Sequence, residues 1–181
     1  MSLTQSIDKP IVLVGLMGAG KTSVGRRLAK RLNIPFCDTD EEIIKAAGCS
    51  IEDIFELYGE AAFRDGERKV IMRLLDEAPM VLATGGGAFI DDTARGHIQK
   101  KGLSIWLQIP LETLIMRTEH RGSRPLLKDK DASSTLKSLM ETRNPIYETA
   151  DITINPTNDT PDDTAETIIK ELEIYFSQSR S

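Results

Sequence analysis

The fold is indicated most strongly by residues 11–22, which read IVLVGLMGAGKT. Residues 15–22 match the pattern G-x-x-x-x-G-K-[ST], in which backbone N–H groups close around phosphate oxygens because the tight positions carry no bulky side chain. The apolar run at residues 11–14 predicts a strand, and a helix is expected to begin at Lys21. Strand, glycine-rich loop and helix in this order predict a phosphate-binding loop at the end of a buried strand.

Nucleotide binding is the chemistry expected of this loop. The helix N-terminus carries partial positive charge, Lys21 can reach the β- and γ-phosphates, and the hydroxyl of Thr22 can ligate Mg²⁺. The loop by itself leaves open a kinase, a GTPase, an ATPase or a regulatory sensor, although the guanine-reading sequence Asn-Lys-x-Asp is absent. The predicted nucleotide-binding residues of the loop are Gly15, Gly18, Ala19, Gly20, Lys21, Thr22 and Ser23.

Short apolar runs alternate with longer amphipathic stretches along the rest of the chain. The runs at residues 11–14, 34–37, 80–83, 103–107 and 152–154 are interpreted as continuously apolar, as expected when helices cover both faces of a parallel sheet. Helical patterns are expected at residues 21–32, 51–58, 63–74, 136–142 and 161–172. We predict an α/β fold in three layers, with a five-stranded parallel sheet, in one domain spanning residues 1–181.

Composition excludes several classes of function. The 181 residues carry a net charge of −5, which argues against a nucleic-acid partner. Cys37 and Cys49 form no C-x-x-C pair and His97 and His120 lie near neither of them, so we expect no zinc site and no disulfide. No apolar stretch reaches the length of a membrane span or signal peptide. We therefore expect a monomeric cytoplasmic protein without a membrane partner.

Two aspartates follow the second apolar run. Asp38 and Asp40 are expected at the carboxyl end of a strand, which is where ligands bind in open α/β sheets. The third apolar run ends in Thr84 and glycines rather than in an aspartate, so the pair is the obvious source of a carboxylate for the metal. A plain helix-capping turn is the alternative interpretation. We predict that one aspartate serves Mg²⁺ and that the other contacts an acceptor hydroxyl.

Candidate acceptor-binding residues lie further along the chain. Gly85, Gly86 and Gly87 follow the third predicted strand, so their backbone amides can approach a ligand directly, although a flexible turn would look the same. Arg64 and Glu67 are spaced as a helical i, i+3 pair, which is either a solvated surface pair or a support that fixes Arg64 as a carboxylate clamp. Arg143 supplies a second guanidinium suited to a carboxylate.

Residues 119–131, EHRGSRPLLKDKD, lack periodicity and are dense in charge. A segment of this kind is either an inert solvated loop or a mobile lid over an active site.

Taken together, these motifs resemble those of the shikimate kinase family, which carry a phosphate-binding loop, D-x-D, F-R, a glycine triplet, R-P-L-L and R-x-x-x-Y in this order. The resemblance covers about residues 11–156. It implies a fold like that of nucleoside-monophosphate kinases, ATP and Mg²⁺ as cofactors, and transfer of the γ-phosphate to the 3-hydroxyl of shikimate on the way to aromatic amino acids. The motifs here are GLMGAGKT at 15–22, DTD at 38–40, Phe63-Arg64, TGGG at 84–87, RPLL at 124–127, and Arg143 to Tyr147.

The same resemblance implies a role for each site residue. The catalytic residues would be Lys21, Asp40 and Arg124, with Arg124 also contacting the nucleotide from a lid at about residues 119–131. Metal binding would fall to Thr22 and Asp38. Arg117 and the turn Asn155-Pro156 are similar to positions that contact adenine in the family. Within an acceptor-binding region at about residues 40–76 and beyond it, shikimate would be held by Asp40, Arg64, Gly85, Gly86, Gly87 and Arg143.

Two other functions are considered. A related metabolite kinase such as a gluconate kinase would keep the phosphate-binding loop and change the acceptor pocket. A non-catalytic ATP sensor would need no acceptor pocket, so the presence of Lys21, Thr22, Asp38 and Asp40 together argues against it.

Overall fold

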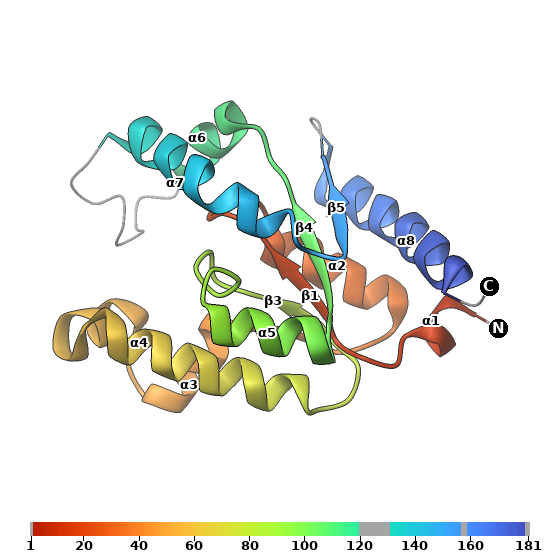
Figure 1. Cartoon of the computed structure of the whole chain (residues 1–181), viewed down its shortest axis with the longest axis horizontal. Coiled ribbons are helices and arrows are strands. Elements are labelled where there is room, and N and C mark those ends of the chain that lie inside the picture. The colour runs from red at the N-terminus through yellow and green to blue at the C-terminus, as the bar shows by residue number, and fades with distance from the viewer. Residues whose placement is uncertain (1, 120–130, 157–158, 180–181) are drawn as a thin grey trace.

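A parallel sheet of five strands forms the centre of the described part of the chain (Figure 1). The structure is a computed structural model that describes residues 2–119, 131–156 and 159–179. All the strand pairings are parallel, so the carboxyl ends of the strands share one edge. In the spatial order β2-β3-β1-β4-β5, the strands are β1 (Ile11–Val14), β2 (Phe36–Asp38), β3 (Val81–Ala83), β4 (Leu103–Leu107) and β5 (Ile152–Ile154). The predicted fold class is confirmed.

Burial of the strands falls from the centre of the sheet to its edges. Every residue of β1, β3 and β4 is buried, whereas β2 is half-buried and Thr153 in β5 is exposed. The expectation of continuous burial is wrong for the two outer strands, because an edge strand is not covered on all sides. Strand β2 also begins at Phe36 rather than at residue 34. The N–H of Ile34 bonds to the Ala29 carbonyl at the end of the preceding helix, and Pro35 has no N–H.

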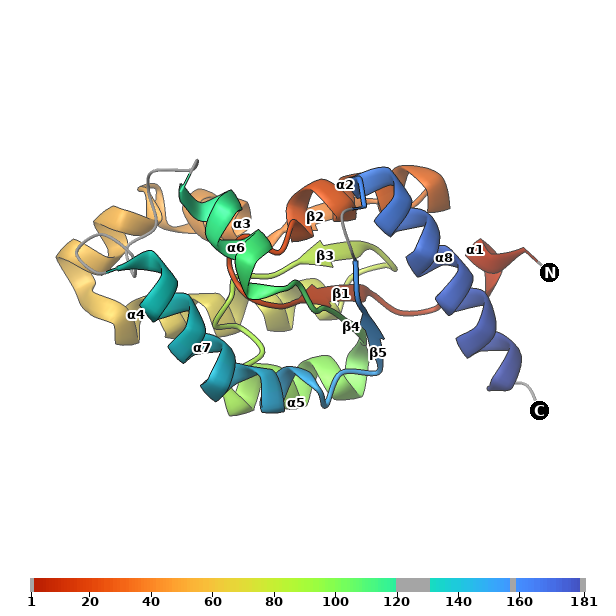
Figure 2. The same ribbon diagram turned by 90° about the horizontal axis from the view of Figure 1, so that it is seen from above.

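Helices cover both faces of the sheet, as Figure 2 shows. In chain order they are α1 (Leu3–Ser6), α2 (Lys21–Leu32), α3 (Thr39–Ala47), α4 (Ile51–Leu75), α5 (Asp92–Lys101), α6 (Leu111–Glu119), α7 (Ala132–Tyr147) and α8 (Pro161–Gln178). Helix α2 packs against α8 on one face, and α5 and α7 lie on the other. The predicted start of α2 at Lys21 is confirmed, and its periodic residues Val24, Leu28 and Leu32 are buried.

Helix α4 joins two segments that the sequence predicts separately, residues 51–58 and 63–74. Gly59 has φ 85° and ψ 172°, which is not helical, and it kinks the helix between the segments. The hydroxyl of Ser50 caps the first segment by accepting from the N–H of Asp53 at 3.1 Å. Because of the kink, Phe55 packs on Phe63 across the bend, with ring centroids 4.8 Å apart. With α3 alongside it, α4 walls one side of the site described below.

Helix α7 runs further than the sequence indicates. The helical pattern ends at Thr142, but the helix continues through Pro145 to Tyr147. A proline removes one backbone bond, and here bonding resumes beyond it, with the Glu148 N–H donating to the Asn144 carbonyl at 2.9 Å. Burial of Tyr147 anchors this last turn. Arg143 therefore projects from a helix rather than from a loop.

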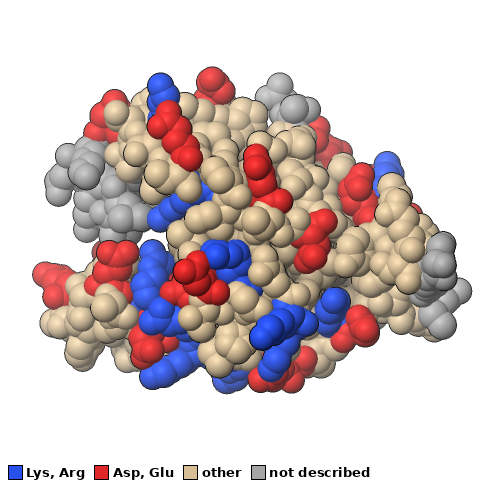
Figure 3. Space-filling view, viewed as in Figure 1, with Lys and Arg blue, Asp and Glu red and all other residues tan. Residues whose placement is uncertain are grey.

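Charged side chains of both signs interleave on the face shown in Figure 3. Several form ion pairs. Arg68 on α4 pairs at 2.6 Å with Asp91, in the loop between β3 and α5, and Arg95 pairs with Asp92 at 2.6 Å within α5. Within the described ranges, no helix is both long and apolar enough to cross a membrane. The predicted lid at residues 119–131, with Arg124, lies almost wholly outside the described residues.

Candidate active site

Three adjoining cavities line the carboxyl edge of the sheet. The phosphate cavity, of about 100 Å³, lies over the phosphate-binding loop. On one side of it is the acceptor cavity, of about 430 Å³, and on the other is the base cavity, of about 240 Å³. The residues that line the phosphate cavity are Gly18, Gly20, Lys21, Thr22, Ser23, Asp38, Asp40, Thr84, Gly85 and Gly86.

The phosphate-binding loop is folded around its lysine. Gly20 immediately precedes α2 with φ 88°, a left-handed conformation that favours glycine, so the first turn of the helix can begin directly at Lys21. Lys21 is 8% exposed, and its Nζ donates to the carbonyls of Gly15 and Leu16 at 2.5 and 2.8 Å. The loop thus holds an ammonium group and a helix N-terminus on one small cavity, which is an environment suited to phosphate.

Thr22 and Asp38 meet beside this loop. The Thr22 hydroxyl donates to Oδ2 of Asp38 at 2.7 Å. Oδ1 of the same carboxylate accepts from the N–H of Asp40 at 2.9 Å and so caps helix α3. Asp38 therefore performs the capping role that the sequence offered as an alternative, while its other oxygen faces Thr22. A hydroxyl and a carboxylate oxygen side by side are ligands of the kind that Mg²⁺ prefers.

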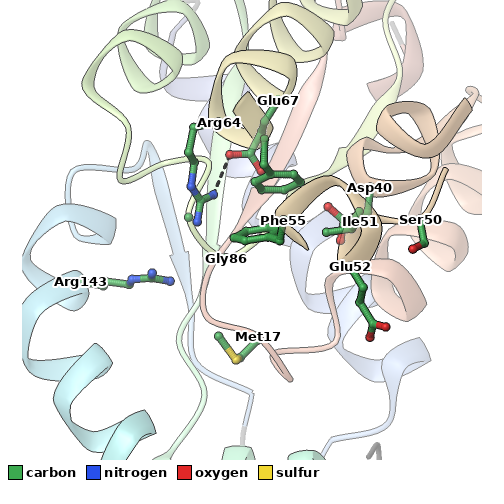
Figure 4. A pocket seen from close by; sticks show the side chains of 13 residues that line it. Met17, Asp40, Ser50, Ile51, Glu52, Phe55, Arg64, Glu67, Gly86 and Arg143 are labelled. Atoms are coloured by element: carbon green, nitrogen blue, oxygen red, sulfur yellow. Dashed lines mark hydrogen bonds and ion pairs between the residues drawn. The ribbon is translucent and has the colours of Figure 1, made fainter. Parts of the chain in front are cut away.

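The acceptor cavity has a charged side and an apolar side. Arg64 on α4 and Arg143 on α7 point into it from different elements, and Phe55 and Ile51 lie across from them (Figure 4). Asp40 lines both this cavity and the phosphate cavity. The full lining is Met17, Asp40, Ser50, Ile51, Glu52, Phe55, Phe63, Arg64, Glu67, Gly85, Gly86, Gly87 and Arg143.

Arg64 is held by a buried carboxylate. Its Nη1 donates to Oε1 of Glu67 at 2.9 Å, and the Glu67 residue is 1% exposed. The interpretation as a solvated surface pair is therefore wrong. Burial raises the pKa of Glu67, although the guanidinium of Arg64 opposes this shift. The second oxygen, Oε2, and the Nη1 atom of Arg143 are buried without a hydrogen-bond partner in the described structure. Buried polar atoms are usually hydrogen-bonded, so these two atoms are candidates to contact a ligand in the cavity.

The glycine turn after β3 lies against both arginines. A β-carbon added to Gly87 would be 2.6 Å from Cζ of Arg64, and one added to Gly86 would be 3.4 Å from Nη1 of Arg143. The Gly85 N–H already donates to the Thr39 hydroxyl at 3.2 Å. The Gly85 amide is therefore already occupied. Among the described residues the N–H groups of Gly86 and Gly87 have no partner, so these two amides are the ones that can approach a ligand.

The base cavity brings together most of the residues expected near adenine. Arg117 lines it and donates from Nη1 to the Gly18 carbonyl at 3.2 Å, and Pro156 lines it as well. Asn155 does not line the cavity, although the predicted adenine-contacting turn included it together with Pro156. Ala19 and Ser23, which are predicted from the sequence to bind nucleotide, also line this cavity. The other lining residues are not among those predicted to bind nucleotide; they are Val24, Ile109, Asp159, Pro161 and Thr164.

Several residues near the acceptor escaped sequence reasoning. Thr39 is fully buried and bonds to the glycine turn, and Tyr147 donates its hydroxyl to the Gly86 carbonyl. Met17 occupies a variable position of the phosphate-binding loop yet lines the acceptor cavity. Phe55 and Ile51 were assigned to a helix face by periodicity, which does not distinguish a core from a cavity wall. Tyr147 was visible as the end of the R-x-x-x-Y pattern but carried no assigned role.

Comparison with known proteins agrees with this geometry. The family model SKI, Shikimate kinase, matches residues 17–173. A shikimate kinase of Paramagnetospirillum magneticum is 51% identical over 179 residues, which is 99% of this chain and 92% of that protein. A shikimate kinase of Caulobacter vibrioides is 54% identical over 153 residues, covering 84% of this chain and 76% of that protein. The solved structure of shikimate kinase from Acinetobacter baumannii in complex with shikimate has a TM-score of 0.90 and 36% identity, with 95% of this chain and 98% of that chain covered. The chain belongs to the shikimate kinase family.

Proposed function

We propose that this chain transfers the γ-phosphate of Mg-ATP to the 3-hydroxyl of shikimate. The observation that carries the proposal is the order of the three cavities. The phosphate cavity shares Gly18, Gly20 and Ser23 with the base cavity, and it shares Asp40, Gly85 and Gly86 with the acceptor cavity. A nucleotide lying in the base and phosphate cavities would present its terminal phosphate to a molecule in the acceptor cavity.

The nucleotide side would act mainly by charge. Lys21 would exchange its contacts with the loop carbonyls for the β- and γ-phosphate oxygens, and the N-terminus of α2 would add its partial positive charge. Thr22 and Asp38 would hold Mg²⁺, which supplies charge neutralisation at the phosphate oxygens when bound. Arg117, with Pro156, would contact the base. Arg124 lies outside the described residues, and its contact with the transferring phosphate is part of the proposal.

On the acceptor side, charge and shape would select the substrate. Arg64 and Arg143 suit a carboxylate, and the partnerless Nη1 of Arg143 is available to one. Asp40 would accept from the attacking hydroxyl, either removing its proton or orienting it. The hydroxyl oxygen bonds to the γ-phosphorus, the bond from that phosphorus to the β–γ bridging oxygen breaks, and ADP leaves. The amides of Gly86 and Gly87 would donate to the acceptor.

Two alternatives are weaker on specific grounds. A gluconate kinase also binds a carboxylate, but its linear polyol would gain little from the apolar wall that Phe55 and Phe63 form, whereas one face of a cyclohexene ring fits such a wall. A non-catalytic sensor would have no use for the half-buried Arg64 paired with the buried Glu67 at the far side of the phosphate cavity, because burying charges is costly unless it serves binding or structure.

The test is a coupled assay of ADP release with shikimate, quinate and gluconate at fixed Mg-ATP. Shikimate is expected to give a kcat/KM at least about tenfold above either competitor, since the acceptor contacts are specific to its shape and charge. Lys21→Ala is the control for adventitious activity and should lose roughly 10²–10³-fold in turnover. A preference for gluconate, or ADP release independent of any acceptor, would contradict the proposal.

A further inference from the structure

In the glycine turn, Gly85 to Gly87, two backbone N–H groups have no hydrogen-bond partner among the described residues. The Gly85 N–H donates to Thr39, and the Gly85 carbonyl accepts from Ala88 at 3.2 Å. The Gly86 carbonyl accepts from the Tyr147 hydroxyl. The carbonyl of Gly87 accepts from the N–H groups of Ile90 and Asp91 at 3.2 and 3.3 Å. In the described structure, the amides of Gly86 and Gly87 are therefore the free donors of the turn, and both residues line the acceptor cavity.

These bonds determine how the two free amides are oriented. In a trans peptide the C=O and the following N–H point in opposite directions, and the described chain has no cis peptide bond. When the Tyr147 hydroxyl holds the Gly86 carbonyl, the Gly87 N–H must point away from Tyr147. Without such bonds a glycine run samples many conformations, because nothing at the β-position restricts it.

The phenol of Tyr147 is itself rigidly held. Its ring is fully buried and stacks on Trp106 and Phe89, with centroid distances of 5.8 and 6.4 Å. Burial raises the pKa of Tyr147 to about 12, so the hydroxyl stays protonated as a donor. Arg143 lies one helical turn earlier on α7, and its guanidinium is close enough to the phenol to lower that pKa in part. The residue thus connects the helix that carries Arg143 to the turn that carries the free amides.

We infer that Tyr147 and Thr39 are positioning residues, whose buried hydroxyls orient the Gly86 and Gly87 amides as donors to the acceptor molecule. The inference deepens the proposed function and rests on it. Thr39 fixes the start of the turn from the segment that holds Asp38 and Asp40, and Tyr147 fixes its middle from α7. Neither side chain lines the acceptor cavity, so both act through the glycine backbone.

Tyr147→Phe is the first test, because it removes one oxygen and keeps the stacked ring. The KM for shikimate should rise about five- to thirtyfold, the range that corresponds to one lost buried hydrogen bond, while the KM for ATP stays within about twofold. Ser104→Ala is the matched control. It also removes a fully buried hydroxyl, one that bonds to Asp151 at 2.8 Å away from the three cavities, so it should lower the melting temperature and leave both KM values unchanged.

Thr39 offers a conservative rescue. Thr39→Ser retains the acceptor for the Gly85 N–H and should keep a shikimate KM near that of the wild type, whereas Thr39→Val should raise it. An unchanged shikimate KM in both Tyr147→Phe and Thr39→Val, or an equal rise in both substrates' KM values, would overturn this inference while leaving the proposed function intact. A wild-type protein that does not turn over shikimate would overturn both.

Discussion

The hydroxyl of Thr22 lies 2.7 Å from Oδ2 of Asp38, which joins the first turn of α2 to the end of β2. This contact places two oxygen atoms that could ligate Mg²⁺ beside the phosphate cavity. Asp40, two residues further on, reaches the acceptor cavity as well. The short segment from Asp38 to Asp40 therefore lies between the phosphate cavity and the acceptor cavity. Substitutions of its two carboxylates are expected to have different effects on activity.

Replacing these aspartates one at a time should distinguish a role in metal binding from a role in binding the acceptor. Asp38→Asn should weaken activity in a way that added Mg²⁺ partly restores, with shikimate binding nearly unchanged, because asparagine still caps α3 but is a poorer metal ligand. Asp40→Asn should lose roughly 10²–10⁴-fold in kcat together with shikimate affinity, and Mg²⁺ should not help. Steady-state kinetics over a magnesium titration measures both. Rescue of Asp40→Asn but not of Asp38→Asn would exchange the two roles.

The two arginines should behave as ligands for a carboxylate that does not react. Arg64→Ala and Arg143→Ala should each raise the KM for shikimate at least about tenfold, with little change in the KM for ATP, because a charge-assisted bidentate contact is lost. Arg73→Ala is a control on the same helix as Arg64. Its side chain is about half exposed and pairs with Glu42 and Glu77 away from the cavities. An effect of Arg64→Ala or Arg143→Ala confined to ATP would move that residue to the nucleotide site.

A single methyl group at Gly87 should reproduce part of the arginine effect. Its β-carbon would lie 2.6 Å from Cζ of Arg64 and would displace the guanidinium, so Gly87→Ala should raise the KM for shikimate about tenfold with little loss of stability. Gly66→Ala, within α4, meets no atom within 4 Å. That variant should gain about 0.5–1 kcal/mol of stability and keep its kinetics. Identical kinetics in the two variants would mean that the Arg64 guanidinium can move away from the added methyl group without weakening the binding of shikimate.

Glu67 should make stability depend on pH. Its pKa in the folded protein is raised from the ordinary value of 4.5 by burial, so the folded state binds the proton more tightly than the unfolded state does. The associated stabilisation is complete below pH 4.5 and is lost as the pH rises through the raised pKa. The difference in unfolding free energy between the wild type and Glu67→Gln, measured in urea, should fall from pH 4.5 to pH 8. A difference that grows with pH would mean that Arg64 holds Glu67 ionised.

Much of the nucleotide side could be predicted because its signals are local. The phosphate-binding loop, the strand before it and the helix after it form one continuous pattern at residues 11–22. Asp38 and Asp40 were placed correctly by a single rule, that ligands bind at strand carboxyl ends. For Asp38 that rule competed with helix capping. In the structure one oxygen of the carboxylate caps α3 and the other accepts from the Thr22 hydroxyl.

The acceptor side depends on contacts between distant parts of the chain. Tyr147 and Gly86 are 61 residues apart, and Thr39 and Gly85 are 46 apart, so no spacing rule connects them. The burial of Glu67 was not foreseen, because an i, i+3 ion pair looks the same in sequence on a surface and in a core. The extension of α7 through Pro145 contradicts the local preference of proline, and burial of the helix end overrides that preference.

The position of the phosphate on the product distinguishes transfer to the 3-hydroxyl of shikimate from transfer to another hydroxyl and from hydrolysis of ATP. After incubation of the protein with Mg-ATP and shikimate, ³¹P–¹H correlation NMR of the product should show phosphorus coupled to the proton on C3, with one ADP formed for each molecule of phosphorylated shikimate. Phosphorus on a different hydroxyl, or ADP accompanied by inorganic phosphate alone, would rule out transfer to the 3-hydroxyl of shikimate.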